Sequence, residues 1–199
     1  MGGALNTYVV FAAVALGVKY LTGLNRLLVD VLFLCIVIAL LCLNLSLVLN
    51  EKCSASAAIS AGEVFKAVFF PWVVMVGGIV ALLHVFPGWK QPFSNTFGYL
   101  AIHIPTVGAK AKLLAILPED KAELKVLIES EPSLLFNEFN LANFDAQMER
   151  MNVKNAAATA SFKGIILLKE LVAEFMWIIL AGSVALITSF NILMNAPCT

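Results

Sequence analysis

Two histidines are the residues of this sequence best suited to bind a metal or a haem. His84 and His103 stand 19 positions apart, and a bis-histidine haem would need both rings at one membrane depth, facing each other. No Cys-x-x-Cys and no His-Glu-x-x-His pattern accompanies them. The simpler interpretation is an interfacial His84 whose ring is hydrogen bonded to backbone or water. We therefore expect no metal and no cofactor.

Patterns for nucleophilic or phosphate chemistry are missing as well. The sequence has no Gly-x-x-x-x-Gly-Lys-Ser/Thr, no Gly-x-Gly-x-x-Gly and no Gly-x-Ser-x-Gly. The acidic pairs Glu119 with Asp120 and Glu129 with Glu131 are typical of solvated helix ends rather than of glycosidase carboxylates. The net charge is zero, so nucleic acid is not an expected partner. We expect a protein that is not an enzyme, and we infer no small-molecule substrate.

Three charged residues precede the last apolar run of the chain: Lys169, Glu170 and Glu174. Glu170 and Glu174 are four positions apart and share one helix face, which carries like charge. We expect this face to be solvated or paired with another chain. A proton relay is the alternative, because carboxylates at membrane depth often have functional roles.

The elements that carry these residues are apolar enough for a membrane. Hydrophobic residues make up 61% of the chain and charged residues 13%, with a mean hydropathy of +0.92. Apolar runs predict four spans, at residues 5–21, 27–49, 67–87 and 175–194. Lys19 interrupts the first run, which still spans if the lysine side chain reaches the headgroups. A cleaved signal peptide is the alternative there, but no positive charge precedes the apolar core.

The predicted fold is therefore an all-α membrane protein with four transmembrane helices and a helix-rich polar excursion between spans three and four. Its parts are three spans with an interfacial aromatic segment (1–104), the polar helical excursion (105–165), and the final span with a short tail (166–199).

Two helices are expected around the excursion. Residues 118–130 begin with proline and two acids and predict a short amphipathic helix. A second helix, capped by Asn143 or Asp145, is expected to run through 144–194, because this stretch contains no proline. Gly164 is the expected point of interruption.

The distribution of basic residues predicts an orientation. Lysines and arginines near the membrane place two regions on the cytoplasmic side, the link between the first two spans and the excursion. These residues are Lys19, Arg26, Lys90, Lys110, Lys112, Lys121 and Lys125. The loop at 50–66 and both termini then lie on the opposite side.

The four cysteines divide into two pairs. Cys35 and Cys42 fall inside the second span, where a buried thiol behaves as a small apolar group. Cys53 and Cys198 both fall just outside the membrane on the non-cytoplasmic side. They can form a disulfide if that compartment is oxidising, or they remain two free thiols.

Small residues at intervals of four predict close packing between helices. Ala13 with Gly17 is one such pair in the first span. The candidate packing positions in the later spans are Gly77, Gly78, Ala81, Ala181 and Ala185. Pro71 is expected to kink the third span.

The stretch FPGWKQPFSNTFGYL follows the third span. Trp89 and Lys90 together suggest an interfacial ring with a cation beside it. Pro92 is expected to keep the chain extended ahead of a short capped element. Turn residues separate the aromatic side chains, which gives an interfacial re-entrant or surface helix or, alternatively, a protein docking site. The anchor residues are Trp89, Lys90, Phe93, Phe97 and Tyr99.

The run GWKQPFSNTFGYL after a membrane span resembles multi-span membrane proteins of large nucleocytoplasmic DNA viruses, of the chlorella-virus kind. The resemblance covers about residues 66–104. It implies a virion inner-membrane or membrane-linked minor capsid protein.

The leading hypothesis from the sequence is a structural protein that links a lipid bilayer to a capsid or other protein layer through residues 105–165. The alternatives are a channel or transporter subunit, with Asn44, Ser46, Ser183 and Thr188 as its sparse polar residues, or an accessory subunit of an organellar membrane complex.

Overall fold

The computed structural model describes residues 2–22, 25–53, 60–104, 107–118, 121–153 and 155–198. Across these ranges every regular element is helical. The longer helices are α1 (Gly2–Thr22), α2 (Arg26–Lys52), α3 (Ala61–Trp72), α4 (Gly78–Val85), α7 (Ala109–Ile116), α8 (Ala122–Ser130) and α11 (Ala156–Met194). The shorter ones are η1 (Val73–Gly77), η2 (Pro87–Lys90), α5 (Gln91–Phe93), η3 (Ser94–Gly98), α6 (Tyr99–Ile102), α9 (Pro132–Glu138) and α10 (Phe144–Arg150).

The chain forms two compact units. We call Met1–Pro87 with Trp177–Thr199 the bundle unit, and Gly88–Met176 the excursion unit. Helix α11 therefore contributes residues to both. These units follow the proximity of backbone segments, whereas the three parts expected from the sequence follow membrane crossings and stay a prediction.

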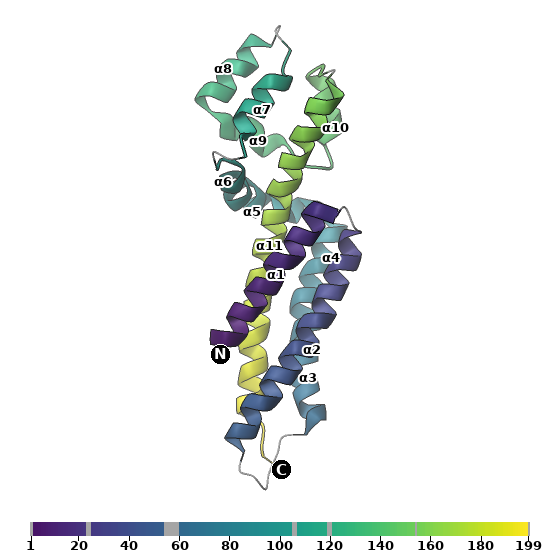
Figure 1. The fold of residues 1–199 in the computed structure, drawn as a ribbon, viewed down its shortest axis with the longest axis vertical. Helices are drawn as coiled ribbons and strands as arrows, with labels where there is room; N and C mark the ends of the chain where they lie inside the picture. Colours follow the sequence, from purple (N-terminus) through teal and green to yellow (C-terminus); the bar gives the residue numbers. More distant parts are fainter. Residues whose placement is uncertain are drawn as a thin grey trace. The chain divides into compact units, whose positions relative to one another are not determined.

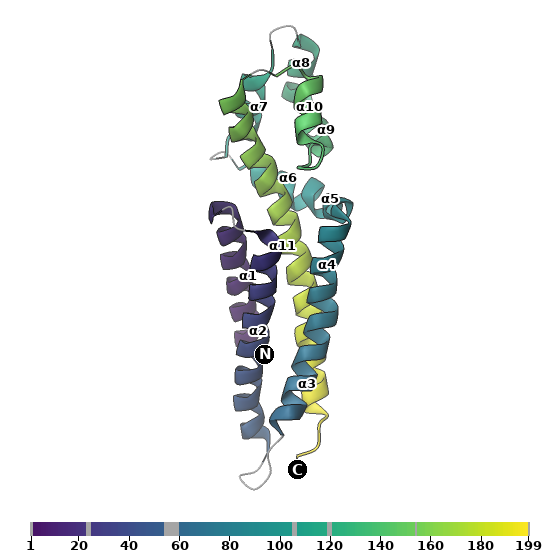
Figure 2. The same ribbon diagram turned by 90° about the vertical axis from the view of Figure 1, so that its right-hand side faces the viewer.

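Four helical stretches are long and apolar enough to cross a bilayer: Ala4–Thr22, Arg26–Leu45, Ala61–Val85 and Ala156–Met194. In the bundle unit α1, α2 and the α3–α4 stretch lie alongside the C-terminal part of α11, and successive helices run in opposite directions (Figures 1 and 2). The exposed sides of these helices are largely apolar, as at Val10, Leu32 and Val184. Since lipid is the solvent that such a surface requires, the fold is that of a multi-pass all-α membrane protein.

The third crossing contains an irregular turn. Ser60 caps α3, because its hydroxyl accepts a hydrogen bond from the backbone N–H of Glu63 at 3.2 Å. Pro71 lies inside this helix, and the widened π-helical turn η1 follows it. Proline lacks the N–H that a regular turn uses, which accounts for a local change of helix type there.

A buried ion pair joins the first two crossings. The ammonium group of Lys19 pairs with the carboxylate of Asp30, and both side chains are almost fully buried. The lysine thus reaches an acidic partner in the bundle rather than the headgroups. Because each charge neutralises the other, both can be held in two otherwise apolar helices.

The excursion unit has a hydrophobic core of its own. Phe136, Phe139, Phe144 and Phe162 are all buried, with ring centroids 5.3 to 6.1 Å apart. Around them pack aliphatic side chains from α6, α7, α8 and α11. The amphipathic helix expected within 118–130 is confirmed as α8, whose Ile128 is fully buried. Such a core allows the unit to fold as a domain rather than as a loop.

The expected interruption at Gly164 is wrong. Helix α11 passes through Gly164 without a break, and the chain turns earlier, between α10 and α11. Asn152 adopts the left-handed conformation there, with φ at 55°, which asparagine tolerates better than most residues. Asn155 then caps α11, because its side-chain oxygen accepts from the backbone N–H of Ala158 at 3.1 Å.

Candidate membrane-interface site

The excursion unit begins with a run of short helical turns, which we call the aromatic segment (residues 88–104). It passes from a 3-10 turn through α5 and η3 to α6. The expectation that Pro92 keeps the chain extended is wrong, because Pro92 lies in the first turn of α5. At that position its missing N–H would have no intrahelical partner in any case.

One side of the aromatic segment is buried. Lys90, Ser94, Gly98 and Ile102 recur every four residues, and all four are buried. The closest approach is at Gly98, where an added Cβ would collide with the backbone oxygen of Lys169 in α11. A glycine at this point lets the two helical backbones touch.

Other side chains of the segment are apolar and exposed. Trp89 is 52% exposed, Phe97 45% and Leu100 67%. Ile104 is also exposed, while Phe93 is half-buried. We call these five side chains the apolar face. The segment therefore exposes apolar side chains, and the predicted anchors Trp89 and Phe97 are among them.

Lys90 differs from the other predicted anchors. Its ammonium group pairs with the carboxylate of Glu174 in α11, with Nζ and Oε2 3.2 Å apart. Only 10% of the Lys90 side chain and 5% of the Glu174 side chain are exposed. The lysine is thus not a cation beside an interfacial ring, and it ties the aromatic segment to α11 instead.

The charged residues before the last apolar run are also buried, which corrects the expectation of a solvated or intermolecular face. Lys169 is fully buried and donates to the backbone oxygens of Phe136 at 2.7 Å and Phe139 at 3.2 Å. The carboxylate of Glu170 accepts from the backbone N–H of Leu141 at 2.6 Å. We call Lys90, Lys169, Glu170 and Glu174 the polar seam. It carries two positive and two negative charges, so its formal charges cancel.

Tyr99, another predicted anchor, is half-buried and packs against His103, with ring centroids 4.0 Å apart. Burial, together with the negative charge of Glu131, raises the pKa of Tyr99 above its ordinary value. Tyr99 therefore contributes to the core of the excursion unit as much as to its surface.

Both histidines use a ring nitrogen within their own helical turn. Nδ1 of His84 lies 2.9 Å from the oxygen of Val80, and Nδ1 of His103 lies 3.2 Å from the oxygen of Tyr99. For His84, this is the hydrogen bond to backbone that we expected in place of haem binding. Among the residues with described positions, no three His, Cys, Asp or Glu side chains gather as metal ligands.

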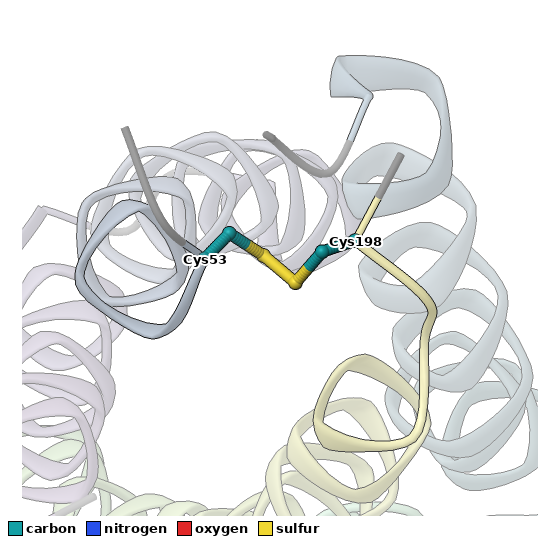
Figure 3. The surroundings of a disulfide bond; sticks show 2 residues. All are labelled: Cys53 and Cys198. Carbon is teal, nitrogen blue, oxygen red and sulfur yellow. A yellow bond between two sulfur atoms is a disulfide. The ribbon is translucent and has the colours of Figure 1, made fainter. Parts of the chain in front are cut away.

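Cys53 and Cys198 form a disulfide, the pairing that the sequence left open. Figure 3 shows the bond joining the end of α2 to the C-terminal tail. The two Cα atoms are 5.9 Å apart, within the range that disulfides require. Cys35 and Cys42 are free, and neither is fully buried: Cys35 is exposed on α2 and Cys42 half-buried.

The predicted packing positions behave differently from one another. Ala185 is fully buried, Ala181 half-buried, and a Cβ at Gly77 would lie 3.5 Å from Leu34. Gly78 and Ala81 are exposed, so within the described chain they face outward.

Gly182 makes a close helix contact in the bundle unit that its sequence spacing did not predict. A Cβ there would collide with the ring of Tyr8, whose hydroxyl donates to the oxygen of Ile178. The spacing of small residues predicted Ala181 as a packing position, and the close contact lies one residue later, at Gly182. Tyr8 is the feature of the sequence that could have indicated this contact, because a tyrosine hydroxyl buried in an apolar helix needs a hydrogen-bond partner.

No protein-family model matches this chain, and no curated protein or solved structure is significantly similar to it.

Proposed function

We propose that this chain is a non-enzymatic structural membrane protein that links a bilayer to a neighbouring protein layer. The observation that carries the proposal is the construction of the aromatic segment. Gly98 and the Lys90–Glu174 pair fix the segment to α11, while its exposed side chains form the apolar face. Exposed aromatic side chains on a segment that is packed against a helix are suited to anchoring a protein at a membrane interface.

The bilayer is the partner proposed for the apolar face. Trp89 is four residues beyond Val85, where the third crossing ends. An extended chain of that length reaches about 14 Å at most, so the chain keeps Trp89 within reach of the headgroups. Tryptophan with neighbouring phenylalanine and leucine is the composition that binds at this depth.

A structural protein is the partner proposed for residues 105–165. This part of the excursion unit has its own packed core and mixed surface charge, and it exposes Val126 on α8 and Leu134 on α9. A protein interface typically has an apolar centre and a polar rim, and exposed aliphatic side chains surrounded by charged ones fit this pattern. The finer proposal, a virion inner membrane beneath a capsid, is supported by the resemblance of residues 66–104 alone.

A channel is less well supported. The side-chain amide of Asn44 donates to the oxygen of Leu40, and the hydroxyl of Thr188 donates to the oxygen of Val184. Both polar groups are thus satisfied within their own helices. The cavity beside Asn44 measures about 10 Å³, which leaves room for about one water molecule.

Site-specific photo-crosslinking in the intact native assembly tests the proposal. A photoreactive residue at Val126 should yield an adduct with a structural protein, whereas one at Leu32, exposed on α2, should yield lipid adducts as a matched control. Absence of a protein adduct from every exposed position within 105–165 would contradict the scaffold role. Copurification with pigment or haem would instead indicate an accessory subunit of an organellar complex.

A further inference from the structure

A groove of about 390 Å³ lies within the bundle unit, between α3–η1 and the C-terminal part of α11. Its sides include Phe70, Val74 and Met75 from the third crossing and Ile192 from the fourth. Its volume is within the range of small-molecule sites. Phe70 and Val74 are 59% and 66% exposed, so the groove opens outward, toward lipid.

The groove follows the helix axis for a limited distance. It extends from Glu63 to Met75, and twelve residues at 1.5 Å each give a length of about 18 Å. A bilayer core is about 30 Å thick, so a single leaflet accounts for about 15 Å of it. A transmembrane helix from another protein would follow the whole crossing, whereas an acyl chain occupies one leaflet. The length therefore favours a lipid.

The outer end of the groove carries both signs of charge. The third crossing begins at Ala61, so Glu63 and Lys66 lie in its first turns, at headgroup depth. Their carboxylate and ammonium groups are 3.2 Å apart, and their side chains are 58% and 64% exposed. An ion pair this exposed is weak, and a ligand that supplies an anion and a cation can replace each partner.

We propose that this groove binds one zwitterionic glycerophospholipid. An acyl chain lies between Phe70, Val74 and Ile192, the lipid phosphate pairs with Lys66, and an ammonium headgroup pairs with Glu63. Phosphatidylethanolamine has this chemistry, and phosphatidylglycerol lacks the ammonium. The site is separate from the aromatic segment and stands whether or not the chain binds a protein layer.

The test uses the full chain in nanodiscs of phosphatidylglycerol, which lacks the ammonium group, with a trace of phosphatidylethanolamine that carries a photoreactive acyl chain. Labelled peptides are located by mass spectrometry. We expect labelling to concentrate at residues 63–75 and 188–192. Val74→Trp, which fills the groove from an exposed position, should abolish most of this labelling, and Leu32→Trp, on the exposed side of α2, should leave it unchanged.

The headgroup is tested by charge removal and by exchange of the probe. Glu63→Gln and Lys66→Gln should each lower phosphatidylethanolamine labelling by roughly two- to fivefold, the scale of one exposed ion pair. A phosphatidylglycerol probe should label less than phosphatidylethanolamine and be insensitive to Glu63→Gln.

Two results would overturn the proposal. One is equal labelling of the Val74→Trp and Leu32→Trp proteins, and the other is crosslinking of residues 63–75 to a second copy of the chain in place of lipid. Ile192→Trp fills the groove from its other side and repeats the test if Val74→Trp fails to fold. Retained helical circular dichroism and an intact Cys53–Cys198 disulfide identify correctly folded variants.

Discussion

Two glycines hold contacts that a larger residue would break. Gly98 lies against the backbone of Lys169, and Gly182 lies against the ring of Tyr8. Gly164 provides a comparison, because a Cβ added there meets nothing within 4 Å. The importance of a glycine in this chain therefore depends on what faces it and not on its helical position.

Replacing Gly98 with alanine should destabilise the excursion unit by about 1–3 kcal/mol, the usual cost of overpacking. Gly164→Ala in α11 should be neutral or stabilising by up to about 1 kcal/mol, since alanine favours a helix. Thermal unfolding of the detergent-solubilised proteins measures both. Equal stabilities of the two variants would show that Gly98 and Lys169 do not touch.

The Lys90–Glu174 pair can be measured with a double-mutant cycle. Lys90→Met or Glu174→Gln alone should cost about 3–5 kcal/mol, because each leaves the partner charge buried. The double variant should lose less than the sum of the two. Lys163 and Asp145 form an exposed pair 2.9 Å apart, so Lys163→Met should cost no more than about 1 kcal/mol. Strict additivity of the two seam substitutions would contradict the pairing.

At the scale of elements, the turn between α10 and α11 sets where the longest helix begins. Asn152 has a positive φ, and Asn155 supplies the cap. Asn152→Gly should leave stability within a few tenths of a kcal/mol of the parent, while Asn152→Val should cost about 1–2 kcal/mol, because a β-branched residue is strained in that conformation. Urea unfolding of the two variants compares them directly. A valine variant as stable as the glycine variant would place Asn152 in an ordinary conformation.

The spans were predictable because a long apolar run indicates its own location in a membrane. The α8 helix was predictable from its local periodicity. The turn at Asn152 was not predictable. The stretch 144–194 contains no proline and therefore favours one continuous helix, which the turn at Asn152 interrupts. Lys90, Lys169 and Glu174 could not be paired from sequence, since their partners lie 30 to 84 residues away. Burial of charge follows from tertiary packing that local patterns do not contain.

At the scale of the whole molecule, the disulfide fixes which segments share a side of the membrane. Cys53 follows the second crossing and Cys198 follows the fourth, and the two residues are 145 positions apart. Cys198→Ser should cost about 2–4 kcal/mol, the typical contribution of a disulfide, whereas Cys35→Ser should change little. A mobility shift on non-reducing gels and thermal unfolding with and without reductant measure this. An oxidised parent protein whose unfolding is insensitive to reductant would contradict a stabilising role.

The disulfide and the basic residues, two independent features, favour the same orientation. A disulfide is expected in an oxidising compartment, and basic residues on the cytoplasmic side. Because one crossing separates Cys53 from the excursion unit, that unit should lie on the cytoplasmic side.

Labelling with a membrane-impermeant maleimide in sealed vesicles tests this account most directly. One free cysteine is introduced at Glu123 in the excursion unit or at Ser60 before the third crossing, in a Cys35→Ser/Cys42→Ser background that keeps the Cys53–Cys198 disulfide, and the two positions report on the two sides. We predict that in vesicles of one orientation only one of the two positions is labelled, and that permeabilisation exposes the other. Labelling of both before permeabilisation, or recovery of the chain in solution without detergent, would contradict a four-span membrane protein.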